Sequence, residues 1–340
     1  MNTRFFNPGL TYQKHKSELD EAYFRVMSSG QLILRKDVEN FEKSLAEYVG
    51  TKYAVALNSC TDALYLALRG LKIGAGDEVL VPSRTFVASA QVIVQVGATP
   101  VYYDIDGKMN ITDKTKAIIP VHIEGEFDKH FGEILEISKR HGLHIIEDAA
   151  QALGAEYNGK RAGSFGVAGC FSFYPAKILG AFGDAGALVT NDEKLYDYVK
   201  DARNHFKEDA RDWGVNSRMD NLQAAFLNVR FPHLPEMLAR RKEIAEMYQA
   251  ELGELDWLEL PLHTEGRVWQ DYIVRTHERD ALFEYLKGYG IETMKNNYPF
   301  PVSKLPQAQA YEDETLRLPC NENLTDDEIY YVIDKIKEYV

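Results

Sequence analysis

Short apolar runs alternate with helical patterns through the first half of this 340-residue chain. The apolar runs occupy residues 53–57, 78–81, 100–103, 117–121 and 143–146. The helical patterns between them include 63–68, 86–96 and 131–141. Strands that are apolar along their whole length are buried on both faces, and helical crossovers join parallel strands. We therefore expect an α/β fold built on a large, mostly parallel sheet covered by helices.

The length predicts about two domains. We expect residues 1–240 to form the large domain with N-terminal helices at 14–29 and 37–49. We expect residues 241–340 to form a smaller α+β domain, with a strand at 272–275 and a helix near 279–289. A last helix is expected between residues 326 and 339.

Charge and cysteine content narrow the possible partners. The chain has 39 basic and 52 acidic residues, a net charge of −13, which argues against a nucleic-acid or anionic-membrane surface. Its three cysteines are widely spaced and show no zinc pattern, which favours a reducing compartment. With no signal-peptide pattern and no apolar run of membrane-spanning length, we expect a cytoplasmic protein.

One lysine, Lys177, stands between an aromatic run and a glycine-rich turn that leads into an apolar strand. A hydrated lysine is a poor nucleophile, but one enclosed by apolar neighbours loses its proton more easily and can form a Schiff base with a carbonyl. Upstream, the apolar run beginning at Ile145 ends in a carboxylate, Asp148. A bound pyridinium nitrogen requires a carboxylate and the aldehyde of the same cofactor requires a lysine, so the pair suggests pyridoxal phosphate.

The segment Asn58-Ser-Cys-Thr-Asp62 turns from a strand into a helix, where free backbone N–H groups and the helix dipole favour an anion. Taken alone, these residues fit an ordinary helix cap better, since Ser, Thr and Asp all cap helices well. With a lysine and a carboxylate expected at the same end of the sheet, a phosphate site becomes the better interpretation.

Three further residues are candidates with an ordinary structural alternative. Phe86 can stack on a flat cofactor ring or belong to the core, as most aromatic residues at a helix start do. His122 can line the pocket or be a buried structural histidine. Gln151, three residues after Asp148, can donate to the phenolic oxygen of the ring or lie on the surface.

In their order and spacing these motifs resemble the DegT/DnrJ/EryC1/StrS family of sugar aminotransferases, fold-type I enzymes that use pyridoxal phosphate to aminate keto-sugar nucleotides. The resemblance runs over nearly the whole chain and takes in residues 50–64, 146–151 and 216–225. Lys177 follows Asp148 by 29 residues and Ser172 by five, as expected of the family.

The resemblance implies a role for each matching position. Lys177 would form the Schiff base with the cofactor and shuttle the proton, while Asp148 pairs with the pyridine nitrogen. Gln151 would contact the ring oxygen and Phe86 would stack on the ring. The residues implied to hold the phosphate are Thr61, Asp62, Ser172 and, from the neighbouring subunit, Asn216. The active unit would therefore be a homodimer with shared active sites, and Arg218 is a candidate either for the substrate diphosphate or for the subunit interface.

Several positions depart from the family pattern. Cys60 stands where glycine is commoner, and Glu124 replaces a usual tyrosine and so brings a carboxylate near the pocket wall. Asn297 replaces a usual histidine, which puts a substrate contact there in doubt. The link from 104 to 117 is roughly ten residues shorter than usual.

We therefore expect an aminotransferase that takes nitrogen from L-glutamate and gives it to C3 or C4 of a nucleotide-linked keto-deoxysugar, for a surface glycan or a secondary metabolite. The enzymatic alternative is a pyridoxal phosphate lyase or dehydratase, which would release ammonia and would not consume glutamate. A catalytically silent binding module with the same fold is the alternative from another class. A nucleotide-binding oxidoreductase is disfavoured because no Gly-x-Gly-x-x-Gly motif opens the first βα unit.

Overall fold

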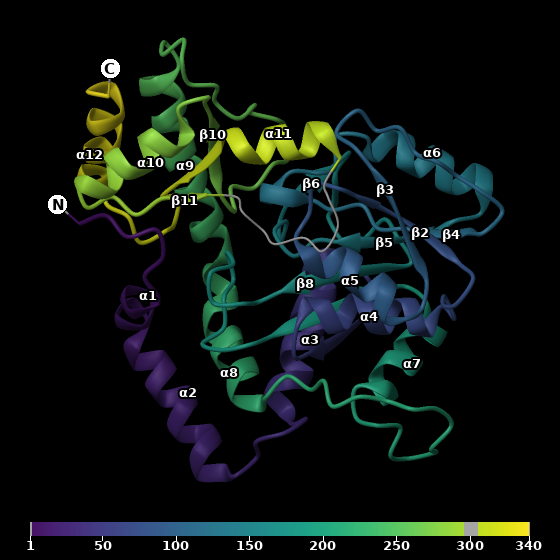
Figure 1. Ribbon diagram of the computed structural model, residues 1–340. Helices are drawn as coiled ribbons and strands as arrows, with labels where there is room; N and C mark the ends of the chain where they lie inside the picture. Colours follow the sequence, from purple (N-terminus) through teal and green to yellow (C-terminus); the bar gives the residue numbers. More distant parts are fainter. Residues whose placement is uncertain (1, 296–304, 340) are drawn as a thin grey trace.

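The large sheet of the computed structural model holds seven strands in the order β1-β9-β8-β5-β4-β2-β3, and the structure describes residues 2–295 and 305–339 (Figure 1). All neighbouring pairs from β8 to β3 are parallel, and β9 runs antiparallel to both β1 and β8. The strands are β1 (Tyr53–Leu57), β2 (Glu78–Pro82), β3 (Thr99–Tyr103), β4 (Thr115–Ile118), β5 (His144–Asp148), β8 (Ala168–Ser172) and β9 (Gly186–Thr190). The expected mostly parallel sheet is confirmed.

Helices cover both faces of this sheet. They are α3 (Lys36–Val49), α4 (Cys60–Gly70), α5 (Val87–Gln95), α6 (Phe131–His141), α7 (Glu193–Ala202) and α8 (Asn221–Arg230). One apolar core contains α3 and α8 with the strand residues that face them, and a second contains α4, α5 and α7. A short hairpin, β6 (Glu156–Tyr157) with β7 (Lys160–Arg161), and a 3-10 turn at Ile123–Gly125 complete this part.

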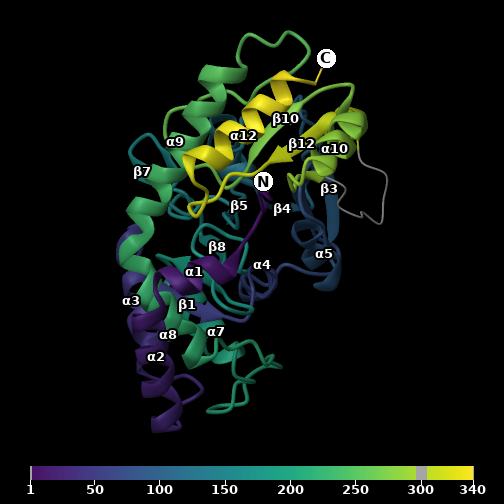
Figure 2. The same ribbon diagram turned by 90° about the vertical axis from the view of Figure 1, so that its left-hand side faces the viewer.

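A smaller sheet of three strands, in the order β10-β12-β11, has its own apolar core. Its strands are β10 (Tyr272–Arg275), β11 (Met294–Lys295) and β12 (Thr315–Leu318), and its helices are α9 (Leu234–Leu252), α10 (Arg279–Gly288), α11 (Pro306–Glu314) and α12 (Asp326–Lys337). The 3-10 turn η2 (Phe231–His233) leads into α9, which runs from the large sheet towards the smaller one (Figures 1 and 2). The boundary that we expected at residue 240 falls inside α9, and Thr3 pairs with Ile291 beside the smaller sheet.

Two N-terminal helices, α1 (Pro8–Lys14) and α2 (Lys16–Ser29), form an arm that extends away from the smaller sheet along α8 (Figures 1 and 2). Ala22 and Val26 of α2 pack on Ala225 of α8. We call α1 and α2 together the N-terminal arm.

Most of the expected elements are observed, but α1, α11 and β12 were not predicted, and β4 differs in its bounds. The apolar run 117–121 predicts a longer strand than the observed Thr115–Ile118. Pro120 has no N–H to donate to a neighbouring strand, so pairing is interrupted there and resumes as an isolated bridge between Val121 and Asp148. No helix in the described part of the chain is both long and apolar enough to cross a membrane.

Candidate active site

The candidate residues gather where the parallel strands of the large sheet end. Asp148 is the last residue of β5 and Ser172 the last of β8, while β1 and β2 lead into the segments that carry Thr61 and Phe86. In open α/β sheets, the crevice beyond the carboxyl ends of the strands is the usual binding site for ligands.

Asp148 is held rigidly by its backbone and by its carboxylate. Its N–H donates to Pro120 and its carbonyl accepts from His122, so β5 is fixed to the segment after β4. The Ser89 hydroxyl donates to Oδ2 at 2.6 Å, and the Ala150 N–H donates to Oδ1 at 3.2 Å. The Cys60 thiol lies 3.8 Å from Oδ1, and burial, followed by the charge of Asp148, raises the pKa of this thiol well above its usual value. A buried carboxylate fixed by neutral donors is suited to hold a positive charge on a ligand.

Lys177 lies in the turn between β8 and β9, partly buried and close to Asp148 and Asp271. Loss of hydration lowers the pKa of Lys177 from its ordinary value. The negative charges of Asp271 and Asp148 oppose this shift, while Arg317 adds to it. The amine is therefore neutral in a larger fraction of molecules than a surface lysine would be at the same pH.

Gln270, from the segment before β10, fixes the turn on both sides of Lys177. Its Oε1 accepts from the N–H of Ile178 at 3.1 Å, and its Nε2 donates to the carbonyl of Ala176 at 3.0 Å. Asp271 next to it forms an ion pair with Arg317 at 3.1 Å. The smaller sheet thus positions the backbone that carries the lysine.

The N-terminus of α4 supplies the groups for an anion. Ser59 caps this helix by accepting from the N–H of Asp62 at 3.1 Å. A side chain on Gly186 of β9 would come within 2.4 Å of the N atom of Cys60, so only glycine allows the helix end to lie this close to the sheet. Thr61 and the Ser172 hydroxyl, which accepts from the N–H of Tyr174 at 3.3 Å, are both partly buried.

The Asp62 carboxylate, which the family resemblance places at the phosphate, is hydrogen-bonded to a protein side chain. Its Oδ2 accepts from the Ser217 hydroxyl at 2.7 Å, and the same hydroxyl accepts from the N–H of Asn58 at 3.2 Å. Asp62 therefore ties the α4 turn to the segment that contains Asn216, which is itself exposed. Arg218 donates to the side chain of Asn204 at 3.0 Å.

Phe86 and Gln151 flank the site from two sides. Phe86, the residue before α5, is 48% exposed and so does not belong to the core. Gln151 is partly buried, and its Oε1 accepts from the N–H of Glu124 at 2.6 Å. With its oxygen engaged in this way, its amide N–H groups are the ones left for a ligand.

Glu124, the departure near the pocket wall, is buried and neutralised by two arginines. Its carboxylate pairs with Arg84 and lies 3.9 Å from Arg267. The backbone of Glu124 has a φ of 63°, and a side chain on the following residue, Gly125, would come within 1.9 Å of the carbonyl oxygen of Val268. This cluster borders a cavity of about 420 Å³ that residues of both sheets line, and the ring centroid of Tyr311 lies 3.9 Å from the Arg84 guanidinium.

His122 lies in a buried ring cluster with Phe127 and Phe131. Its Nε2 is 3.0 Å from the Glu147 carboxylate, and its Nδ1 accepts from the N–H of Asp128 at 3.4 Å. These contacts support the structural alternative for His122. Asn297 lies outside the described residues.

The profile of the DegT/DnrJ/EryC1/StrS aminotransferase family matches residues 13–337. The chain belongs to this family. A dTDP-3-amino-3,4,6-trideoxy-alpha-D-glucose transaminase of Streptomyces venezuelae is 39% identical over 98% of this chain and 95% of its own length. A dTDP-3-amino-3,6-dideoxy-alpha-D-galactopyranose transaminase of Aneurinibacillus thermoaerophilus is also 39% identical, with 96% of each chain covered.

The fold agrees with that of solved DegT/DnrJ/EryC1/StrS enzymes. The crystal structure of S. venezuelae DesV in complex with a ketimine intermediate superimposes with a TM-score of 0.93. It shares 38% of its sequence and covers 99% of this chain and 98% of its own. The aminotransferases of this family depend on pyridoxal phosphate.

Three polar residues of this DegT/DnrJ/EryC1/StrS site were not predicted. Ser89 fixes Asp148, Ser217 joins Asp62, and Gln270 positions the Lys177 turn. Ser89 has a local signal, because it lies one helical turn after the Phe86 that opens α5. Gln270 has none, since it is 92 residues from Ile178 along the chain.

Proposed function

We propose that this protein transfers the amino group of L-glutamate to C3 of a nucleotide-linked keto-deoxysugar, with pyridoxal phosphate as its cofactor. The observation that carries the proposal is a partly buried lysine of lowered pKa beside a rigid carboxylate at the end of the parallel sheet. The choice of C3 is supported by the two relatives, both of which are named as transaminases of 3-amino sugars. A cytoplasmic location and a product destined for a glycan or a secondary metabolite belong to the same proposal.

The residues of the site fit this cofactor. Its phosphate suits the α4 N-terminus with Thr61 and Ser172, because backbone N–H groups, hydroxyls and the helix dipole all favour an anion there. Asp148 suits a protonated ring nitrogen, and the exposed face of Phe86 suits stacking. When bound, the cofactor supplies a carbonyl for the amine and a ring that withdraws electrons from the reacting carbon.

In this proposal, each residue of the site has a distinct role in the reaction. Lys177 would hold the cofactor covalently, and its amine would move the proton at the reacting carbon. Positioned proton transfer of this kind contributes about 10²–10⁴-fold. Asp148 keeps the ring nitrogen protonated, and the Gln151 amide donates to the ring oxygen. Gln270 keeps the Lys177 turn in place.

The active unit in this proposal is a homodimer. Apolar side chains are exposed along the N-terminal arm, among them Tyr23 at 42%, Phe24 at 63% and Met27 at 45%. Tyr23 and Phe24 line a groove of about 500 Å³ together with Phe182 and Phe226. A second copy of the chain would cover this surface and bring its partner near the exposed Asn216. Light scattering should give twice the chain mass of 38.7 kDa.

The decisive assay incubates the holoenzyme with L-glutamate and matched 3-keto and 4-keto sugars on dTDP and on UDP. We expect 2-oxoglutarate to form in a 1:1 ratio with an amino sugar, and faster with the 3-keto compounds. Ammonia release without consumption of glutamate would mean a lyase or dehydratase instead. No turnover with any sugar by protein that carries its cofactor would reject sugar amination.

Replacing Phe86 with alanine should weaken cofactor binding with little effect on folding. Aromatic stacking contributes about 0.5–1.5 kcal/mol, so the Kd for pyridoxal phosphate should rise roughly 2- to 13-fold. The side chain is 48% exposed, so the free energy of unfolding of the apoprotein should change by only about 0.5 kcal/mol. Tyr330→Ala, at a similarly exposed aromatic side chain on α12, is the matched control. Unchanged affinity in Phe86→Ala would exclude stacking.

Replacing Gln270 with leucine should loosen the Lys177 turn. The N–H of Ile178 and the carbonyl of Ala176 would lose their partner, at a cost of about 1–3 kcal/mol for a buried group. We expect kcat to fall by about tenfold with little change in the KM for the sugar. Gln249→Leu removes a comparable bond, to the carbonyl of Pro261, away from this turn. Equal losses of kcat in both variants would show that only general stability is affected.

A further inference from the structure

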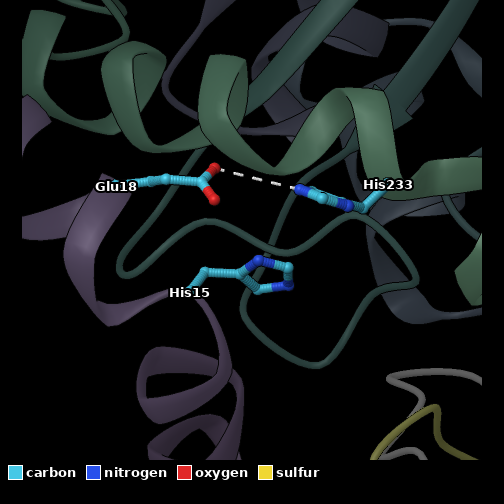
Figure 3. Close-up of side chains that lie close together, drawn as sticks. All are labelled: His15, Glu18 and His233. Carbon is cyan, nitrogen blue, oxygen red and sulfur yellow. Dashed lines mark ion pairs between the residues drawn. The ribbon is translucent and has the colours of Figure 1, made fainter.

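Two histidines from distant parts of the chain meet at the base of the N-terminal arm. His15 lies between α1 and α2, and His233 ends η2 immediately before α9. Their ring centroids are 4.5 Å apart. Glu18, from the first turn of α2, points its carboxylate towards His233 (Figure 3). One ligand atom from each of these three residues lies within 4.8 Å of the other two.

The same short pattern, His-x-x-Glu, occurs at both helix starts: His15 with Glu18, and His233 with Glu236. A serine or threonine before a helix and a glutamate three residues later commonly form a capping box. Here neither histidine side chain caps its helix. The helix dipole favours Glu18 and Glu236 in the first turns of α2 and α9, but helix capping does not account for the two histidines.

The contacts of His233 have the arrangement found around metal-binding histidines. Its Nε2 is 3.9 Å from the Glu18 carboxylate, and its Nδ1 is 3.7 Å from the Glu236 carboxylate. A histidine that binds a metal through one ring nitrogen usually directs the other towards a carboxylate, which fixes the tautomer. Glu236 is placed to do this for His233.

The local charge balance permits a cation. Lys14 and the N-terminal ends of α2 and α9 oppose one, as do the arginines that border the adjoining cavity of about 240 Å³. These arginines are already paired: Arg230 with Glu322 at 3.3 Å, and Arg240 with Asp326 at 2.7 Å. The carboxylates of Glu18 and Glu236 offset the remaining positive charge.

We propose that His15, Glu18 and His233 bind a divalent transition metal ion, with Zn²⁺ the best match. Two imidazoles and a carboxylate are typical Zn²⁺ ligands, and water would complete the tetrahedron. Ligand atoms around Zn²⁺ are roughly 3.4 Å apart, so the side chains must close by about 1 Å or more. Glu18 is free to move this far because its side chain is 59% exposed.

The ion would fasten the N-terminal arm to the η2–α9 junction, more than 200 residues away in the sequence. Outside this cluster, the arm packs on α8 through Ala22 and Val26, and Arg25 of α2 pairs with Asp37 of α3 at 2.7 Å. The metal would add a further attachment, at the base of the arm. Metal binding to the folded state alone would stabilise the arm by mass action and slow its local unfolding.

The test uses tag-free holoenzyme that has been treated with chelator and then titrated with ZnCl₂ in a calorimeter. We expect saturation at one Zn²⁺ per chain, a higher melting temperature and slower proteolysis within residues 8–29. His233→Gln and Glu18→Gln, both at partly exposed side chains, should each weaken binding at least tenfold. Glu236→Gln should weaken it by about tenfold, the lower end of the range for such outer contacts.

His141→Gln is the matched control, since His141 is exposed at the end of α6 and lies outside the cluster. It should bind Zn²⁺ like the wild type. Identical affinities in the wild type, His233→Gln and Glu18→Gln would overturn the proposal, and so would wild-type binding well below one ion per chain.

Discussion

Replacing Lys177 with alanine is expected to abolish covalent cofactor attachment and to lower turnover by at least about 10²–10⁴-fold, the share of proton transfer alone. The purified variant should lack the visible band of the lysine-bound cofactor. After borohydride reduction, mass spectrometry should find the cofactor on Lys177 in the wild type and nowhere in the variant. Lys194→Ala, at an exposed lysine of α7, should behave like the wild type. Wild-type turnover by Lys177→Ala would refute the proposed chemistry.

The lowered pKa of Lys177 also predicts how the rate of cofactor attachment depends on pH. A lysine reacts with a carbonyl as the neutral amine, so the rate of cofactor attachment to the apoprotein should rise with pH. Because the folded protein lowers this pKa, the midpoint of the rise should lie below 10.5, the ordinary value for lysine. Attachment trapped by borohydride at a series of pH values would measure it. A midpoint at or above 10.5 would contradict the effect of burial.

The sheet could be predicted because its strands are apolar on both faces and stand out against the amphipathic helices between them. Asp148 was predicted as a carboxylate at the end of an apolar strand, and Lys177 as a lysine between an aromatic run and a glycine-rich turn. Their catalytic roles stay predictions. Their positions in the fold follow from the parallel topology, which brings the ends of β5 and β8 to the same end of the sheet.

What the sequence did not predict depends on contacts between distant segments. The pattern around His122 is compatible with a pocket or a core, and the contacts with Glu147 and with the rings of Phe127 and Phe131 favour the core. The carboxylate of Glu124 suggested a negative pocket wall, whereas Arg84 and Arg267 neutralise it. Both arginines come from other elements, and no periodicity or spacing connects them with residue 124.

The proposed mechanism gives Asp148 and Lys177 different roles, and experiments can test these roles separately. Lys177 carries its amine at the end of four methylene groups, and we propose that this amine forms and releases a bond with the cofactor. Asp148 is fixed by three donors and a backbone paired on both sides, so its charge stays at one place. In the proposed mechanism, Lys177 controls attachment and proton transfer, and Asp148 controls the electronic state of the ring.

Asp148→Asn should consequently retain the cofactor but lose most of its activity. An ion pair at about 4 Å with an effective dielectric constant near 20 is worth roughly 4 kcal/mol, or about three pKa units of the ring nitrogen. Without it the nitrogen loses its proton at neutral pH, and kcat should fall by up to about 10³-fold. The amide oxygen can still accept from Ser89, so the local structure should persist.

The measurement compares the spectrum and kcat of Asp148→Asn with those of Asp113→Asn, which changes an exposed aspartate in the loop before β4. We expect the lysine-bound cofactor band in both variants and a loss of turnover only in Asp148→Asn. A cofactor analogue methylated at the ring nitrogen carries a permanent positive charge, so it should restore part of the lost rate. Full activity of Asp148→Asn would mean that the ring nitrogen need not be protonated, and the role given to this carboxylate would then be wrong.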